Sequence, residues 1–167
     1  MKYTSAQANK LLRKLQAEKE DLELAEQRTC TFVAANTEDE ESLRPAYSFE
    51  ETQSELARVN HQIRRVKHAI NVFNATTVLP GFDMTIDEVL VCMPQLRQRL
   101  VRLYNMAVRL PKQRCSRMGN SNIIDYEYAN YDIAAVKAEG EKIADEIRRI
   151  QTALDVLNNT VVMEMDV

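Results

Sequence analysis

A repeat with an offset of 84 residues constrains this chain more than any other feature of its sequence. Residues 62–76 align with residues 146–160, and apolar positions coincide along both stretches, for example Ile63 with Ile147. Self-similarity at a fixed offset is typical of a supersecondary unit that occurs twice. We therefore expect the two halves of the chain to share one local architecture.

Apolar residues recur at alternating intervals of three and four, which is the spacing of an amphipathic helix that packs along one face. The spacing predicts four long helices. Their expected ranges are about 5–30, 48–73, 85–110 and 132–157. Ser5 is expected to cap the first helix, and Thr85 with Glu88 forms a capping-box pattern at the start of the third.

Two residues interrupt this pattern inside the helices. Pro94 lacks a backbone donor and clashes with the carbonyl of Leu90, but the apolar spacing continues across it. We therefore predict a kinked but continuous third helix. Gly140 occupies an apolar position of the fourth helix, where it lowers helix stability but allows a neighbouring backbone to approach closely.

Four amphipathic helices in two tandem hairpins predict an all-α fold. We expect a four-helix bundle with pseudo-twofold symmetry in a single domain, residues 1–167, with repeat halves of about 1–83 and 84–167. Only three glycines and four prolines are present, too few for a turn-rich β fold or a nucleotide-binding βαβ unit. Because each apolar stripe is narrow, we also predict a homo-oligomer that covers a wider surface.

Composition excludes several functional classes. A formal net charge of −3 argues against nucleic-acid binding by the whole surface, so no specific nucleic-acid partner is expected. No apolar run approaches the roughly 20 residues that span a bilayer, and no secretory leader is visible. The three cysteines fit neither a zinc motif nor a disulfide framework. We expect a cytoplasmic protein with no membrane association and no cofactor.

The case for an enzyme is weak. His61 and His68 share a helix face, but a metal site needs further ligands, so we interpret both as solvated side chains. Cys115 lies among basic residues that favour a nucleophilic thiolate, but no histidine is near in sequence, so we interpret it as an incidental thiol. Glycine-rich phosphate loops, serine elbows and paired-cysteine motifs are absent from the sequence. We therefore predict no catalytic or metal-ligating residue.

The charge distribution is more informative. From residue 95 to residue 122 there are seven basic side chains and no acid, whereas residues 18–55 are heavily acidic. Arginine binds phosphate through two parallel hydrogen bonds, and tyrosine rings can stack on a base. The ligand-binding residues expected on this reasoning are Arg97, Arg99, Arg102, Tyr104, Arg109, Arg114, Arg117, Tyr126, Tyr128 and Tyr131. The simpler alternative is that the basic and acidic stretches attract each other within or between subunits.

Several short motifs resemble a family of small all-helical bacterial proteins labelled septicolysin-like and largely without assigned function. The resemblance spans most of the chain, and its positions are Ile70, Asn71, Asn74, Thr77, residues 85–90, residues 132–136, Asn158 and Thr160. The chain departs from that family at Cys92, Met93 and Pro94, where members carry charged residues. The resemblance implies a helical fold and says little about chemistry.

The function expected from the sequence is that of a non-catalytic, oligomeric binding protein. The first hypothesis is that it binds or sequesters a small anionic, nucleotide-type ligand in a pocket lined by arginine and tyrosine. The alternative is a protein interaction scaffold assembled by the acidic and basic segments. A third hypothesis is an enzyme that uses Cys115 or a metal site at His61 and His68.

Overall fold

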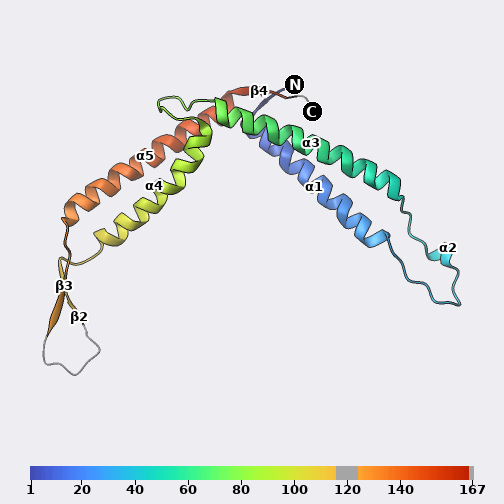
Figure 1. Cartoon of the computed structure of the whole chain (residues 1–167), viewed down its shortest axis with the longest axis horizontal. Coiled ribbons are helices and arrows are strands. Elements are labelled where there is room, and N and C mark those ends of the chain that lie inside the picture. Colours follow the sequence, from blue (N-terminus) through green and yellow to red (C-terminus); the bar gives the residue numbers. More distant parts are fainter. Residues whose placement is uncertain (116–123, 166–167) are drawn as a thin grey trace. The chain divides into compact units, whose positions relative to one another are not determined.

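Long helices occupy most of the chain in this computed structural model, which describes residues 1–115 and 124–165 (Figure 1). In chain order the elements are β1 (Lys2–Thr4), α1 (Ser5–Thr29), α2 (Glu40–Leu43), α3 (Phe49–Thr76), α4 (Ile86–Ala107), β2 (Lys112–Cys115), β3 (Asp125–Tyr128), α5 (Ile133–Thr160) and β4 (Val162–Glu164). The long helices lie where the apolar spacing predicted them, so the mostly helical class is confirmed. Within the described residues, the short strands are an addition that the all-α prediction did not contain.

The helices begin where side chains satisfy their first backbone N–H groups. Thr4 caps α1: its hydroxyl accepts a hydrogen bond from the Gln7 backbone at 3.3 Å, and the Gln7 side chain accepts one from the Thr4 backbone at 2.9 Å. The prediction that Ser5 caps this helix was wrong, because Ser5 is buried in the first turn. The predicted capping box of Thr85 and Glu88 is present at the start of α4.

The chain forms two compact units, and each is described by itself. The first unit consists of Met1–Thr76 and Leu157–Val167, and the second of Thr77–Val156. The boundary after Thr76 lies near the predicted boundary of the repeat halves, but the C-terminal segment belongs with the first unit. The assembly of all the helices into one symmetric bundle, and the single domain that it implied, stay predictions.

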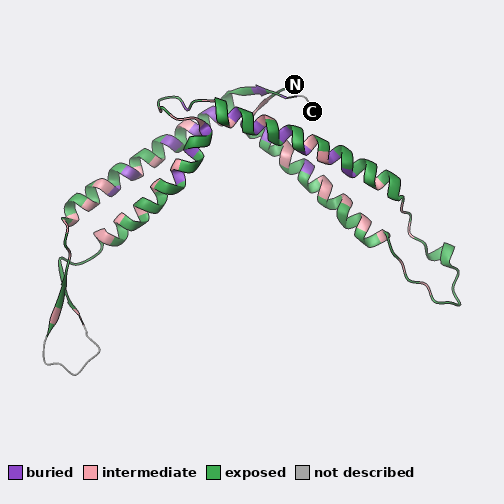
Figure 2. Ribbon diagram, in the orientation of Figure 1, coloured by how far each residue is buried: buried purple, intermediate pink, exposed green. Residues whose placement is uncertain are grey.

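In the first unit, α3 runs back alongside α1 (Figure 1). The buried stripe that joins them is visible along the facing sides of the two helices in Figure 2. Its buried apolar residues are Ala8, Leu15, Leu56, Val59, Ile63, Val66, Ile70 and Phe73. Polar contacts flank the stripe. The Tyr47 hydroxyl donates a hydrogen bond to Glu26 at 2.8 Å, and the Arg58 guanidinium pairs with Glu18 at 2.6 Å.

The chain ends form a two-stranded antiparallel ribbon in the same unit. Strand β1 pairs with β4, with Tyr3 opposite Met163. Main-chain hydrogen bonds extend the pairing to Met1 and Met165, with N···O distances of 2.7 and 2.9 Å. The C-terminal segment therefore docks on the N-terminal strand.

In the second unit, α4 packs against the part of α5 that precedes Leu157. Gly140 of α5 faces Leu100 and Leu103 of α4. Helix α4 continues through Pro94, as predicted. Between the helices, β2 and β3 form an antiparallel hairpin in which Lys112 lies opposite Tyr128.

A tight loop precedes α4. The Leu79 backbone N–H donates to the carbonyl of Met84 at 2.9 Å, and the Leu79 side chain is fully buried. Gly81 has φ of +81°, the left-handed region that favours glycine. Among the described residues, none of the helices is both long and apolar enough to cross a membrane.

Candidate functional site

The arginines of α4, expected to form an anion site, do not converge. Arg97 and Arg99 are two positions apart, which places them on different sides of the helix. The guanidinium of Arg99 pairs with Glu139 of α5 at 2.8 Å, and Arg102 is exposed. Tyr104 lies farther along α4 and is 54% exposed.

The base of the β2–β3 hairpin gathers a second subset of the expected residues. Arg109, Tyr128 and Tyr131 line a hollow of about 40 Å³. The Arg109 guanidinium pairs with Glu127 at 2.8 Å, and the Tyr131 hydroxyl donates a hydrogen bond to the Met106 carbonyl at 2.9 Å. Ligand pockets usually enclose about 300–1,000 Å³, so this hollow is too small for a nucleotide.

The hairpin itself carries the remaining expected residues. The Lys112 ammonium lies 4.0 Å from the ring centre of Tyr126 and 5.3 Å from that of Tyr128, so both rings make cation–π contacts with it. Arg114 lies opposite Tyr126 in the strand register. Arg117 lies outside the described residues.

The expected arginines and tyrosines that the structure describes therefore share the second unit but occupy three separate places in it: the sides of α4, the base of the hairpin and the hairpin strands. Arg99 and Arg109 pair with Glu139 and Glu127, which lie outside the acidic stretch of residues 18–55, so the expected attraction between the basic and acidic stretches stays a prediction. That these residues bind a ligand stays a prediction.

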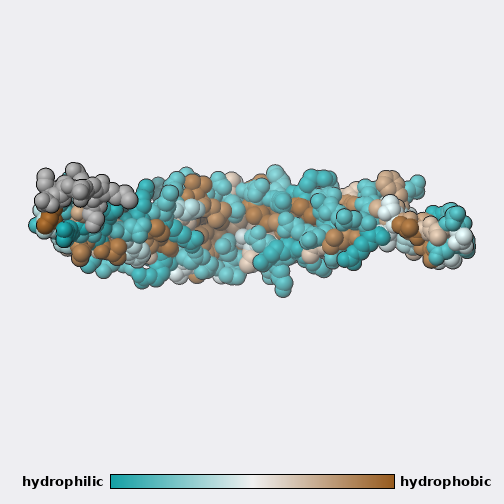
Figure 3. All heavy atoms as spheres, turned by 90° about the horizontal axis from the view of Figure 1, so that it is seen from below, coloured by the Kyte–Doolittle hydropathy of each residue, from teal (hydrophilic) through white to brown (hydrophobic). Residues whose placement is uncertain are grey.

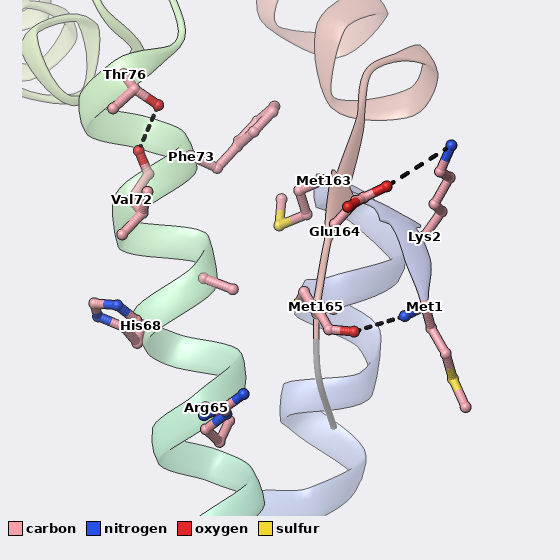
Figure 4. Close-up of a pocket in the computed structure, with 11 residues that line it drawn as sticks. Met1, Lys2, Arg65, His68, Val72, Phe73, Thr76, Met163, Glu164 and Met165 are labelled. Carbon is pink, nitrogen blue, oxygen red and sulfur yellow. Dashed lines mark hydrogen bonds and ion pairs between the residues drawn. The ribbon is translucent and has the colours of Figure 1, made fainter.

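A ligand-sized hollow lies instead in the first unit, between α3 and the β1–β4 ribbon (Figure 4). Its volume is about 960 Å³, and we call it the terminal groove. The residues that line it are Met1, Lys2, Arg65, His68, Ala69, Val72, Phe73, Thr76, Met163, Glu164 and Met165. The groove is open, and it depends on the pairing of the two chain ends.

The floor of the terminal groove is apolar. Phe73 of α3 and Met163 of β4 extend toward one another (Figure 4), and both are buried, at 8% and 7% exposure. Met165 is also buried, whereas Val72 is 47% exposed on the α3 wall. Methionine side chains are flexible and polarizable, so a floor rich in them adapts to irregular apolar ligands.

Polar side chains rim this floor, and the basic ones are in excess. Arg65 and His68 lie on consecutive turns of α3, with the His68 ring on the side of α3 away from the ribbon in Figure 4, and Lys2 extends from β1 on the side of the ribbon away from α3. Lys2 faces Glu164 across the ribbon at 3.8 Å, with both side chains well exposed. Among the lining residues Lys2 and Arg65 are basic, and Glu164 is the single acid.

The residues considered for metal binding or catalysis are dispersed. His68 lines the terminal groove, whereas His61 lies elsewhere on α3 and is exposed. Cys115 ends β2 opposite Asp125. Within residues 1–115 and 124–165, no three side chains of His, Cys, Asp or Glu group closely enough to hold a metal ion.

Sequence reasoning missed the terminal groove because no element was expected after residue 157. Burial alternates along residues 162–165, with Met163 and Met165 buried and Val162 and Glu164 exposed, which is the period of a half-buried strand. The sequence shows this alternation only weakly, because Val162 is apolar as well. Neither the partner strand nor the nearby face of α3 could be inferred from that alternation.

Comparisons with known proteins bear on the fold. The chain is similar to the crystal structure of a functionally unknown conserved protein from Corynebacterium diphtheriae, with a TM-score of 0.61 and 19% identity. The alignment covers 98% of this chain and 100% of that one. At this identity the likeness shows the fold alone. No curated protein matched the sequence.

A family model described as a family of unknown function (DUF6847) matches residues 19–163. Neither this description nor that of the crystal structure mentions a septicolysin-like family, so that resemblance is not confirmed. The match covers most of the chain, including α3, α4 and α5. The chain therefore belongs to the DUF6847 family.

Proposed function

We propose that this protein is a non-catalytic binding protein whose terminal groove holds a small amphiphilic anion. The observation that carries the proposal is a ligand-sized groove with basic side chains around an apolar, methionine-rich floor. An apolar body would lie on Phe73, Met163 and Met165. A carboxylate or phosphate head would meet Arg65 and His68 on α3.

The nature of the floor favours an aliphatic ligand over a nucleotide. Base recognition usually relies on stacking against an exposed aromatic ring. Phe73 is the aromatic residue among those that line the groove, and it is 8% exposed. Methionine and valine side chains suit an acyl chain instead, so dodecanoate is the probe of choice and ATP is the comparison.

Isothermal titration calorimetry of the full chain tests this proposal. Dodecanoate is expected to bind, and Arg65→Gln is expected to weaken binding about tenfold or more, because a hydrogen bond to a charged group contributes about 1.5–3 kcal/mol. Arg64→Gln is the matched control, since Arg64 is the neighbouring arginine on α3 and does not line the groove. Equal effects of the two substitutions would refute the assignment of the anion to Arg65.

A second pair of variants tests the apolar contact. Val72 lies in the groove at 47% exposure, and Val156, its counterpart in the sequence repeat, is 59% exposed and does not line it. Val72→Glu is expected to abolish dodecanoate binding, whereas Val156→Glu is expected to leave it intact. Loss of binding in both variants would point to general destabilisation and would contradict the site.

One observation favours the nucleotide hypothesis: Lys112 makes cation–π contacts with Tyr126 and Tyr128 on the hairpin. If ATP binds while dodecanoate does not, and if Tyr128→Ala removes ATP binding, the ligand site belongs on the hairpin. Native mass spectrometry of the purified chain, before and after denaturation, would identify any ligand that is carried through purification.

A further inference from the structure

Helix α4 carries two apolar stripes, and only one of them is covered. The inner stripe contains Ile86, Val89 and Met93, all buried. The second stripe, which we call the outer stripe, consists of Leu90, Pro94, Arg97, Val101, Tyr104 and Val108, the last of which is the C-cap residue of the helix. Its members are all exposed, and Leu90, Val101, Tyr104 and Val108 have exposures of 52%, 57%, 54% and 79%. One edge of the Tyr104 ring also lies near Gly140 of α5, and the rest of the ring is exposed.

The outer stripe has the spacing of a helix-pairing seam. Its residues follow one another at intervals of four, three, four, three and four, which is the heptad pattern by which two helices pack. The positions that directly follow Leu90, Arg97 and Tyr104 in the sequence are uncharged, and Val91 among them is 58% exposed. Hydrophobic side chains also reach the surface among hydrophilic ones in the space-filling view of Figure 3. A solvated helix face would carry charges at these positions instead.

We propose that the outer stripe binds the outer stripe of a second copy, with the two α4 helices antiparallel about a twofold axis. In such an interface each residue meets a fixed counterpart on the other copy. The spacing is self-complementary in one register. That register places Leu90 opposite Val108, Pro94 opposite Tyr104 and Arg97 opposite Val101 of the second copy.

Arg97 is the single charged residue of the outer stripe, and this register gives it a partner. Arg97 lies one turn along the helix from Pro94, and Pro94 lies opposite Tyr104 of the second copy. The ring of that Tyr104 can therefore make a cation–π contact with the Arg97 guanidinium. The chain makes this type of contact elsewhere: Lys112 lies 4.0 Å from the ring centre of Tyr126, and Arg149 lies 5.6 Å from that of Phe82. A partner helix without an aromatic residue in this place would leave Arg97 desolvated and unpaired.

The available area is sufficient for a pair. Val91 and the four exposed apolar residues of the outer stripe together present on the order of 500 Å² per copy, judged from their exposed fractions. Two copies would bury about 1,000 Å², which is the lower limit for a specific protein interface. A second copy therefore satisfies the spacing, the charge and the area requirements together.

Sedimentation velocity of the full chain at about 100 µM tests the proposal. The wild type is expected to sediment as a dimer. Val101→Lys places a lysine opposite Arg97 of the second copy, and it is expected to weaken the dimer about a hundredfold, because like charges in an interface are strongly unfavourable. Val156→Lys, at a residue of similar exposure on α5, is the matched control and is expected to remain dimeric.

Two further variants separate this register from a general loss of folding. Val101→Glu places a carboxylate opposite Arg97 and is expected to keep the dimer. The double variant Arg97→Glu with Val101→Lys restores opposite charges and is expected to recover the association lost in Val101→Lys. A monomeric wild type would overturn the proposal and leave the outer stripe to a different helical partner. A Val101→Lys variant that remains as dimeric as Val101→Glu would overturn it as well.

Discussion

The replacement of Gly140 by alanine tests how closely α4 and α5 approach each other. A methyl group built on Gly140 would lie 3.9 Å from Leu100 Cδ1, 3.9 Å from Leu103 Cβ and 4.0 Å from Tyr104 Cε1. These are ordinary van der Waals distances, so an alanine fits without displacing its neighbours. The sequence pattern suggested a glycine retained for close helix approach, whereas these distances leave room for one methyl group.

The expected magnitude follows from two contributions. Alanine is favoured over glycine inside a helix by about 1 kcal/mol. Three new carbon contacts add about 0.4 kcal/mol at roughly 0.1–0.2 kcal/mol each. Gly140→Ala should therefore raise the free energy of unfolding by about 1.4 kcal/mol, which corresponds to a rise of about 3–5 °C in Tm for a chain of this size. Gly140→Leu should lower stability, because its extra atoms must displace Leu100 and Leu103.

Urea denaturation followed by far-ultraviolet circular dichroism measures this change in the free energy of unfolding. Gly81→Ala is the control of opposite sign. No atom lies within 4 Å of a methyl group at Gly81, but its φ of +81° strains any other residue, so a loss of about 1 kcal/mol is expected. A clear loss of stability in Gly140→Ala would refute the reasoning, since it would mean that the helices pack more closely than described.

Four other substitutions test local interactions. Thr85→Ala should lower the free energy of unfolding by about 1 kcal/mol, measured by urea denaturation, because the capping box of α4 is lost. Hydrogen bonds from Thr85 hold the pKa of Glu88 below its ordinary value of 4.5. The stabilisation by the Glu88 carboxylate is therefore present above pH 4.5 and is lost as pH falls through the lowered pKa. Glu88→Gln should remove that part of the acid dependence of Tm. The hydrogen bond to Glu26 raises the pKa of Tyr47 above 10.0. The contribution of this hydrogen bond to the free energy of unfolding is therefore present below pH 10.0 and is lost as pH rises through the raised pKa. Tyr47→Phe should make the stability less dependent on pH in the alkaline range. Ile150→Ala should cost about 3 kcal/mol in urea denaturation, because the side chain is fully buried. A value below about 1 kcal/mol would contradict that burial.

Local sequence signals were sufficient for the helices. Spacing of three and four residues located α1, α3, α4 and α5, and the capping box at Thr85 marked the start of α4 correctly. The first cap was misassigned by one residue, to Ser5 instead of Thr4, because the two adjacent residues are both of types that cap helices and serine is the more strongly preferred. These signals work because helix hydrogen bonds and caps join residues only three or four positions apart.

The sequence predicted that a site would contain basic side chains, but it did not predict where in the structure that site lies. Arginines and tyrosines are concentrated in one sequence segment, yet helix geometry separates Arg97 from Arg99, and Arg109 pairs with Glu127. Basic residues that are close together in the sequence therefore do not converge on one site in the structure. Basic residues that were not singled out, Lys2 and Arg65, line the ligand-sized groove instead.

By itself, the sequence determined the helices, their apolar faces and the absence of familiar catalytic motifs, because each of these depends on neighbouring residues. Only the tertiary structure decided where a ligand-sized groove lies. That groove requires residues 2–4 to pair with residues 162–164, which lie at opposite ends of the chain. Strands of three residues leave almost no periodic signal, and their pairing is set by long-range packing against α3.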